Sequence, residues 1–102
     1  MTPRQLLSHK LRDGAYRARK AGCEAVTIPV ADAGELAKQT GCFYCGAELG
    51  DGPGDYTIEH IVPLAKKGPH VLGNLCKACP ACNQDKHIQT ALDYLASLDR
   101  WS

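Results

Sequence analysis

The stretch CFYC at residues 42–45 and the stretch CPAC at residues 79–82 are two CxxC pairs. In each pair the spacing lets both thiolates bind one tetrahedral ion, with Zn–S bonds of about 2.3 Å. Soft thiolates select Zn²⁺, and four protein ligands leave no open coordination position, which is typical of a structural site. We therefore predict a structural zinc clamp, with two disulfides or unrelated buried thiols as the alternatives. Its ligands are Cys42, Cys45, Cys79 and Cys82.

Two further cysteines lie outside these pairs. Cys76 precedes the second pair but is out of register with it. We predict that Cys76 is a small core residue, with exchange into the zinc site as the alternative. Cys23 follows a glycine, and we predict that it is a free thiol in a loop.

The size and composition of the chain favour one folded domain. It has 102 residues, of which 44% are apolar, so an intrinsically disordered chain is excluded. A domain of this size buries a limited core, so a bound metal would add greatly to its stability. No apolar run approaches the ~20 residues of a membrane span, and the N-terminus lacks the apolar region of a secretory signal. We therefore expect a cytoplasmic protein, encoded by a bacterium or a phage, without a membrane partner.

The N-terminal segment carries the signals of an amphipathic helix. Thr2 is a typical N-cap, Pro3 suits the first helical position, and Gln5 completes a capping box. Gly22 is typical of the residue that follows a helix, whereas Gly14 weakens the helix by roughly 1 kcal/mol. Apolar residues recur three or four positions apart and form one face for burial. They are Leu7, Leu11, Ala15 and Ala18.

Shorter elements follow along the chain. The segment Asp32–Glu35 is a D-x-x-E cap, which predicts a second helix of about two turns. The segment Tyr56–Val62 is rich in β-branched residues and predicts a strand, and Leu75–Ala78 predicts a second short strand. From Pro80 the pattern is helical, with apolar residues in 91–98 marking one face.

Charge is unevenly distributed. Residues 1–20 contain six basic side chains and one acid, so this segment carries +5 although the whole chain carries +1. A basic segment on a near-neutral domain indicates a polyanionic partner, with a solvated helix face as the alternative. We predict that residues 1–41 form a basic N-terminal helical arm and that residues 42–102 form the zinc-clamped core and C-terminal helix, together one compact domain.

The segment between the CxxC pairs contains EHIVPL at residues 59–64 and GNL at residues 73–75, and NQDK follows the second pair at residues 83–86. Taken singly, a histidine on a strand is often structural, and an asparagine after a glycine is often a turn residue. In this order, with a CxxC pair on each side, they resemble the HNH endonuclease family in its zinc-binding branch. The resemblance covers about residues 42–86.

The resemblance implies an α+β fold with a ββα-metal core, the His-Me finger, joined to the four-cysteine zinc clamp and the N-terminal helices. By position His60 would be the general base, and Asn74 would hold the loop and the His60 backbone in place. Glu59 and Asn83 would hold a catalytic Mg²⁺ or Mn²⁺. Asn83 occupies the third position of the family name, so the chain is an H-N-N variant. Glu59 stands where the family usually has Asp.

Physical chemistry supports these roles independently. Neutral imidazole, with an unperturbed pKa near 6.5, accepts a proton from water near neutral pH. A hard cation neutralises charge that develops on a phosphate, and it prefers oxygen ligands such as carboxylates and amides. Neighbouring residues of a regular strand point to opposite faces, so Glu59 and His60 can serve one phosphate only if the strand bends or ends there.

We therefore predict an endonuclease that hydrolyses DNA phosphodiester bonds, with double-stranded DNA as its partner. Three alternatives stay open: a non-catalytic zinc-finger nucleic-acid-binding module, a zinc-stabilised interaction subunit beside a protein partner such as a phage packaging machine, and an RNA substrate. Sequence preference is expected to be loose. The predicted contacts to the nucleic-acid backbone are Lys86, Lys66, Lys67, Arg12, Arg17, Arg19 and Lys20.

The remaining candidates receive structural interpretations. We expect His70 to be a solvent-exposed loop residue, with contact to DNA or the metal as the alternative. Tyr44 and Tyr56 are expected to be packing groups and not stacking platforms for bases.

Overall fold

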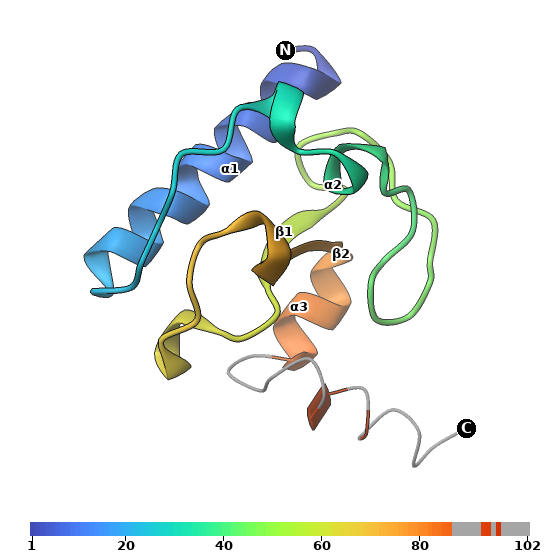
Figure 1. Ribbon diagram of the computed structural model, residues 1–102. Coiled ribbons are helices and arrows are strands. Elements are labelled where there is room, and N and C mark those ends of the chain that lie inside the picture. The colour runs from blue at the N-terminus through green and yellow to red at the C-terminus, as the bar shows by residue number, and fades with distance from the viewer. Residues whose placement is uncertain (87–92, 95, 97–102) are drawn as a thin grey trace.

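The computed structural model describes residues 1–86, 93, 94 and 96 (Figure 1). The long helix α1 (Pro3–Lys20) is followed by the one-turn helix α2 (Glu35–Lys38). The strands β1 (Thr57–His60) and β2 (Leu75–Ala78) form a hairpin, and the helix α3 (Pro80–Lys86) comes after β2. The residues predicted to mark the apolar face of this helix, Ala91, Leu92, Leu95 and Leu98, lie outside the described residues. None of the described helices is long and apolar enough to cross a membrane.

The hairpin and α3 form the ββα unit that the sequence predicts, within an α+β domain. The strands are antiparallel, with Thr57 opposite Ala78 and His60 opposite Leu75. β2 has the predicted bounds, whereas β1 is shorter than the predicted Tyr56–Val62. The strand ends at His60 because the next backbone groups turn toward a side chain: the amide of Val62 donates to Asn74 Oδ1 at 2.8 Å.

Helix α1 begins as its sequence predicts. Thr2 Oγ1 accepts a hydrogen bond from the backbone N–H of Gln5, and Gln5 Oε1 accepts one from the backbone N–H of Thr2, so the capping box is complete. Gly22 follows the C-cap residue with φ of +76°, a left-handed conformation that costs glycine little. The four predicted apolar residues are buried, and Leu7 and Leu11 pack in one cluster with residues of the hairpin.

The second predicted helix is wrong in its start and its length. The segment Val30–Asp32 is a 3-10 turn, and α2 spans only Glu35–Lys38. Its N-cap is Gly34, which makes no side-chain cap hydrogen bond, so Asp32 does not cap it. Leu36 is the one buried residue of α2, and packing therefore supports a single turn, since short helices depend on tertiary contacts.

The pleat of the hairpin divides its side chains between two cores. Adjacent residues of a strand point to opposite faces, so Ile58 and His60 share one face while Glu59 lies on the other. The first core lies between the hairpin and α1 and contains Leu7, Leu11, Ala33, Leu36, Tyr56, Ile58 and Leu75. The second includes two cysteines of the CxxC pairs and contains Cys42, Tyr44, Cys76, Ala78, Cys82 and Tyr94. Both predicted packing tyrosines are therefore buried in a core.

Candidate active site and zinc site

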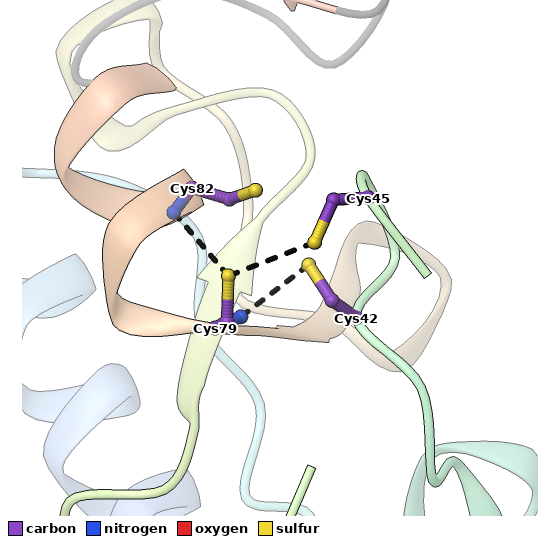
Figure 2. A group of neighbouring side chains, drawn as sticks. All are labelled: Cys42, Cys45, Cys79 and Cys82. Atoms are coloured by element: carbon purple, nitrogen blue, oxygen red, sulfur yellow. Dashed lines mark hydrogen bonds between the residues drawn. The ribbon is translucent and has the colours of Figure 1, made fainter. Parts of the chain in front are cut away.

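The four cysteines of the two CxxC pairs converge at one point (Figure 2). Cys42 and Cys45 come from the loop after α2, Cys79 follows β2, and Cys82 lies in α3. Their sulfur atoms lie within 4.8 Å of one another, and Cys45 Sγ is 3.8 Å from Cys79 Sγ. Zn–S bonds of about 2.3 Å in a tetrahedron require sulfur atoms about 3.8 Å apart, so the cluster could hold a zinc ion. All six cysteines are free thiols, which contradicts the disulfide alternative.

Backbone amides around the cluster point at the sulfur atoms. The N–H groups of Tyr44 and Cys79 each donate to Cys42 Sγ at 3.4 Å. Burial raises the pKa of Cys42, but backbone N–H groups outweigh this effect and hold the pKa at about 6. Burial raises the pKa of Cys82 to about 12, a shift that a bound cation opposes. Because metal binding requires thiolates, the surroundings of Cys42 favour the form that Zn²⁺ needs.

The two other cysteines lie apart from the cluster. Cys76 is buried, and its thiol donates to the hydroxyl oxygen of Tyr44 at 3.9 Å. It is a small core residue, as the sequence predicts, and the zinc cluster is formed without it. Cys23 is a free thiol beyond the end of α1, but it is buried, and its thiol donates to the Leu64 carbonyl at 3.5 Å.

His60 ends β1 on the face that α1 covers, and its side chain is buried. Its Nε2 lies 3.0 Å from Nδ1 of His70, so the two imidazoles share one hydrogen bond. Burial, helped by the charges of His70, Arg17 and Lys86, lowers the pKa of His60 to about 4. The His60 ring is therefore neutral at neutral pH, which is the form that accepts a proton.

The expectation that His70 is exposed is wrong, because its side chain is fully buried. Its backbone is held by a neighbouring segment: the His70 N–H donates to the Glu24 carbonyl at 2.7 Å, and the Val26 N–H donates to the His70 carbonyl at 3.0 Å. The sequence around His70 is a loop rich in glycine and proline, which carries no periodic signal of burial. Helix α1 packs against the ring at Gly14, where an added Cβ would lie 2.8 Å from His70 Cε1.

Glu59 and Lys86 form an ion pair behind the end of β1. Lys86 Nζ donates to Glu59 Oε1 and to the backbone carbonyl of His60, each at 3.2 Å. Burial raises the pKa of the Glu59 carboxyl, and the Lys86 ammonium opposes that shift. The Lys86 side chain is completely buried, so the predicted contact of Lys86 with a phosphate is not supported. Its ammonium is buried and already donates to two acceptors of the same chain, the Glu59 carboxylate and the His60 carbonyl.

Asn74 connects the end of β1 to the loop that carries His70. Its Oδ1 accepts from the Val62 N–H at 2.8 Å, and its Nδ2 donates to the carbonyls of Val62 at 3.1 Å and Pro69 at 2.8 Å. Its own carbonyl accepts from the Ile61 N–H at 2.8 Å. These bonds hold the backbone that follows His60, at Ile61 and Val62, and the carbonyl of Pro69 that precedes His70.

One cleft of about 530 Å³ is lined by Glu59, His60 and Asn83 together with Lys10, Asp13, Tyr16 and Arg17 of α1. Asn83 lies in α3, half-buried, and among the described residues its side chain makes no hydrogen bond. Three predicted catalytic residues therefore line the same cleft, although Glu59 and His60 leave the strand on opposite faces. They can do so because β1 ends at His60.

Residues 42–89 match the family model of the HNH endonuclease. This chain carries an HNH endonuclease domain. The match begins at Cys42 and includes both strands and α3, but it leaves out α1. No curated protein was found that matches the chain.

Basic residues predicted to contact nucleic acid surround the HNH domain in two settings. Those of α1 are all exposed, and Arg17 is the member that lines the cleft; they are Arg12, Arg17, Arg19 and Lys20. Lys66 and Lys67 are exposed but engaged: Lys66 pairs with Asp93 at 3.8 Å, and Lys67 donates to the Ala21 carbonyl at 3.1 Å.

Proposed function

We propose that this HNH domain hydrolyses phosphodiester bonds of double-stranded DNA, with His60 as the general base and one divalent cation held by Glu59 and Asn83. The observation that carries the proposal is the convergence of these three residues in one cleft, with Arg17 of a basic helix on its wall. The family of the domain, whose members are described as endonucleases, supports the same reaction.

Glu59 and Asn83 suit a hard cation such as Mg²⁺ or Mn²⁺, because a carboxylate and an amide offer the oxygen ligands it prefers. Lys86 donates to Glu59 Oε1, in the way that metal-binding carboxylates are commonly held by a neighbour, and the Glu59 carboxylate would supply an oxygen ligand to the ion. The bound ion would supply charge neutralisation for the phosphate and the leaving oxygen.

His60 provides the base. Its low pKa keeps the imidazole neutral, and a phosphate placed in the cleft would raise that pKa toward the working pH by its negative charge. Nε2 faces His70, so Nδ1 is the nitrogen that takes the proton of the attacking water. Asn74 holds the backbone beyond His60 through Val62, which limits movement of the base.

The wall formed by α1 would bind the substrate. Arg17 is exposed and lines the cleft, and a guanidinium is suited to bidentate contact with a phosphate. The other arginines of α1 lie on the exposed surface and would add affinity that does not depend on base sequence and falls with salt.

The zinc ion proposed for the four-cysteine cluster has a structural role. All four positions of the ion would be filled by cysteine, which leaves no place for water or substrate. The clamp ties the loop of Cys42 to α3, which carries Asn83.

Nicking of supercoiled plasmid in the presence of Mg²⁺ or Mn²⁺ tests the reaction. We expect cleavage by the parent protein and a loss of at least 100-fold in His60→Ala, since general bases contribute about 10²–10⁴-fold. His9→Ala is the matched control, because His9 is an exposed histidine of α1 outside the cleft. If His60→Ala cuts as fast as the parent, the mechanism is wrong.

The same assay separates the alternative functions. A parallel RNA substrate that is cut faster than DNA would replace the proposed substrate. DNA binding without cleavage under any divalent cation would favour a non-catalytic zinc module. Cleavage that appears only with an added protein would favour a subunit that works beside a partner.

A further inference from the structure

We propose that the domain cuts duplex DNA beside an unpaired nucleotide, whose base stacks on Tyr16 while its phosphate enters the cleft beside Arg17. The inference rests on the proposed function and names the feature of the DNA that the site selects. No sequence motif points to Tyr16, and α1, which carries it, lies outside the HNH match. The selection therefore belongs to the helix that this chain adds to the HNH domain.

The catalytic candidate lies deep in a cleft with two walls. Helix α1 forms one wall, and β1 with Asn83 of α3 forms the other. His60 is only 5% exposed, so a phosphate must enter the cleft to reach it. The volume of about 530 Å³ is that of a site for a small molecule. An unpaired nucleotide can enter such a cleft at little cost, whereas a paired one must first leave the stack of bases.

The positive charge available in the cleft suits one phosphate. The guanidinium of Arg17 is exposed and makes no hydrogen bond or ion pair within the described residues. The ammonium of Lys10 is already engaged, since it donates to two backbone carbonyls at 3.0 and 3.1 Å. Asp13 and Glu59 add two carboxylates to the lining. Further affinity for the substrate must therefore come from a contact other than charge.

Tyr16 offers that contact at the rim of the same cleft. It lines the cleft but is 63% exposed, so packing does not account for the ring. In the part of the chain that the structure describes, its hydroxyl makes no hydrogen bond. Lys20 Nζ lies 5.8 Å from the ring centroid, a cation–π contact one helical turn away. The exposed part of the ring can take a base, and such stacking strengthens binding about 5- to 150-fold for any of the bases.

The order of residues around α1 fits a nucleotide with its phosphate inward and its base outward. Gly14 faces the histidine rings, with an added Cβ 3.8 Å from His60 Cε1. At 3.6 residues per turn, Tyr16 leaves the helix on nearly the opposite side from Gly14, and Arg17 lies between them. From His60 outward, α1 therefore presents a guanidinium and then an aromatic ring. In a fully paired strand the base faces the partner strand and is not available to Tyr16.

Binding without cleavage tests the inference on the full zinc-loaded chain. Two labelled duplexes of one sequence are compared by fluorescence anisotropy without added Mg²⁺ or Mn²⁺. One duplex is fully paired, and the other has a short gap in one strand that leaves bases unpaired. We expect the gapped duplex to bind at least about 10-fold more tightly, within the range that base stacking supplies. Equal Kd values for the two duplexes would overturn the proposal.

Variants of Tyr16 show whether the ring is the cause. Tyr16→Leu removes the ring at an exposed position and keeps a good helix former, so we expect it to fold. Its affinity for the gapped duplex should fall about 5- to 150-fold, while its affinity for the paired duplex stays within about two-fold. Tyr16→Phe keeps the ring and should bind both duplexes as the parent does.

Arg12→Ala is the control for a change on the surface of α1, because Arg12 is exposed and lies outside the cleft. It should lower both affinities by the same factor, since a phosphate contact does not distinguish the two duplexes. If Tyr16→Leu also weakens both duplexes equally, Tyr16 does not bind an unpaired base and the inference is wrong.

The two proposals fail separately. If the parent cuts no DNA, the proposed function falls, while anisotropy still decides whether Tyr16 binds an unpaired base. If the parent cuts both duplexes with the same kcat/KM in Mg²⁺, the proposed function stands and the selection is wrong. Support for both proposals is a kcat/KM at least about 10-fold higher on the gapped duplex, with the preference lost in Tyr16→Leu and kept in Tyr16→Phe.

Discussion

Gly14 occupies the middle of α1, where glycine ordinarily weakens a helix by about 1 kcal/mol relative to alanine. Its position beside the histidine pair explains its presence. An added Cβ would lie 2.8 Å from His70 Cε1, 3.1 Å from His70 Nδ1 and 3.8 Å from His60 Cε1. The absent side chain lets α1 rest directly on the imidazoles. One residue therefore sets how closely the helix can approach the site.

Gly14→Ala tests this contact by the sign of its effect. In an exposed helix the change would stabilise the protein by about 1 kcal/mol, but here the methyl group meets a fully buried ring that is bonded on the other side. We expect the free energy of unfolding to fall by about 1–3 kcal/mol, as overpacking does, and nicking to slow. Urea denaturation measures the first effect. A variant more stable than the parent would show that α1 does not press on His70.

The low pKa of His60 makes stability depend on pH. The unfolded chain has an ordinary histidine pKa near 6.5, and the folded value is about 4 because of burial and nearby positive groups. Between pH 6.5 and pH 4 the unfolded chain therefore binds a proton at His60 that the folded chain does not bind. The contribution of His60 to the free energy of unfolding is fully present above pH 6.5 and is lost as pH falls from 6.5 toward 4. The loss is on the order of 3 kcal/mol by pH 4.

Urea denaturation at several pH values between 7 and 5 measures this linkage. The slope of the unfolding free energy should be smaller in His60→Gln than in the parent, by up to about 1.4 kcal/mol per pH unit. His9→Gln should keep the slope of the parent, because this histidine is exposed. Zinc loss at low pH affects all three proteins and cancels in the comparison. Equal slopes in the parent and His60→Gln would contradict the prediction.

At the scale of elements, the site depends on where β1 stops. A strand that continued to Val62 would keep Glu59 and His60 on opposite faces of a regular sheet. Asn74 prevents this, since its side chain takes the backbone N–H and carbonyl of Val62 out of the ladder. The same side chain holds Pro69, next to His70. A single amide thus joins the end of β1 to the loop that returns to β2.

Asn74→Ala removes three hydrogen bonds of a buried side chain. At a net contribution of about 1 kcal/mol each, the free energy of unfolding should fall by about 3 kcal/mol. Hydrogen exchange of the Val62 amide should accelerate, because that amide loses its acceptor. An Asn74→Ala protein as stable as the parent would rule out the role of Asn74 in holding the backbone after His60.

Asn83→Ala is the contrasting variant. It should leave stability nearly unchanged while nicking is lost, since the Asn83 side chain makes no hydrogen bond within the described residues.

At the scale of the whole molecule, two connections hold the ββα unit. On one side α1 shares an apolar core with the hairpin through Leu7 and Leu11. On the other side the cysteine cluster joins the loop after α2 to α3. The HNH match covers residues 42–89, yet the cleft is completed by α1. A helix outside the match therefore lines the cleft that holds the candidate residues.

Removal of zinc should weaken the whole domain. A four-thiolate site contributes binding energy of about 10–16 kcal/mol in small zinc peptides, comparable to the total stability of a domain. We expect about one zinc per chain by metal analysis, and cooperative loss of structure in the circular dichroism spectrum when a chelator removes it. Cys79→Ser should lose the metal, whereas Cys23→Ala should keep it, because Cys23 lies outside the cluster. A protein that remains folded without zinc would disprove the structural role.

The sequence by itself determined the features that depend on local spacing. These are the four cysteines of the cluster, the capping box of α1, the order of strands and helix, and His60 and Asn83 as candidates. CxxC spacing, capping residues and motif order are all properties of neighbouring residues. It could not show the length of α2, which packing limits to one turn.

Only the tertiary structure decided the partners of the site residues. It buried His70 against His60 and enclosed Lys86 with Glu59. It also placed Gly14 against the two histidine rings and Arg17 on the wall of the cleft. These contacts join α1, the loop after β1 and α3, which are far apart in the chain. No periodicity in the sequence indicates which surface a distant helix covers. A histidine in a glycine-rich loop and a lysine after the second CxxC pair were therefore both predicted to be exposed.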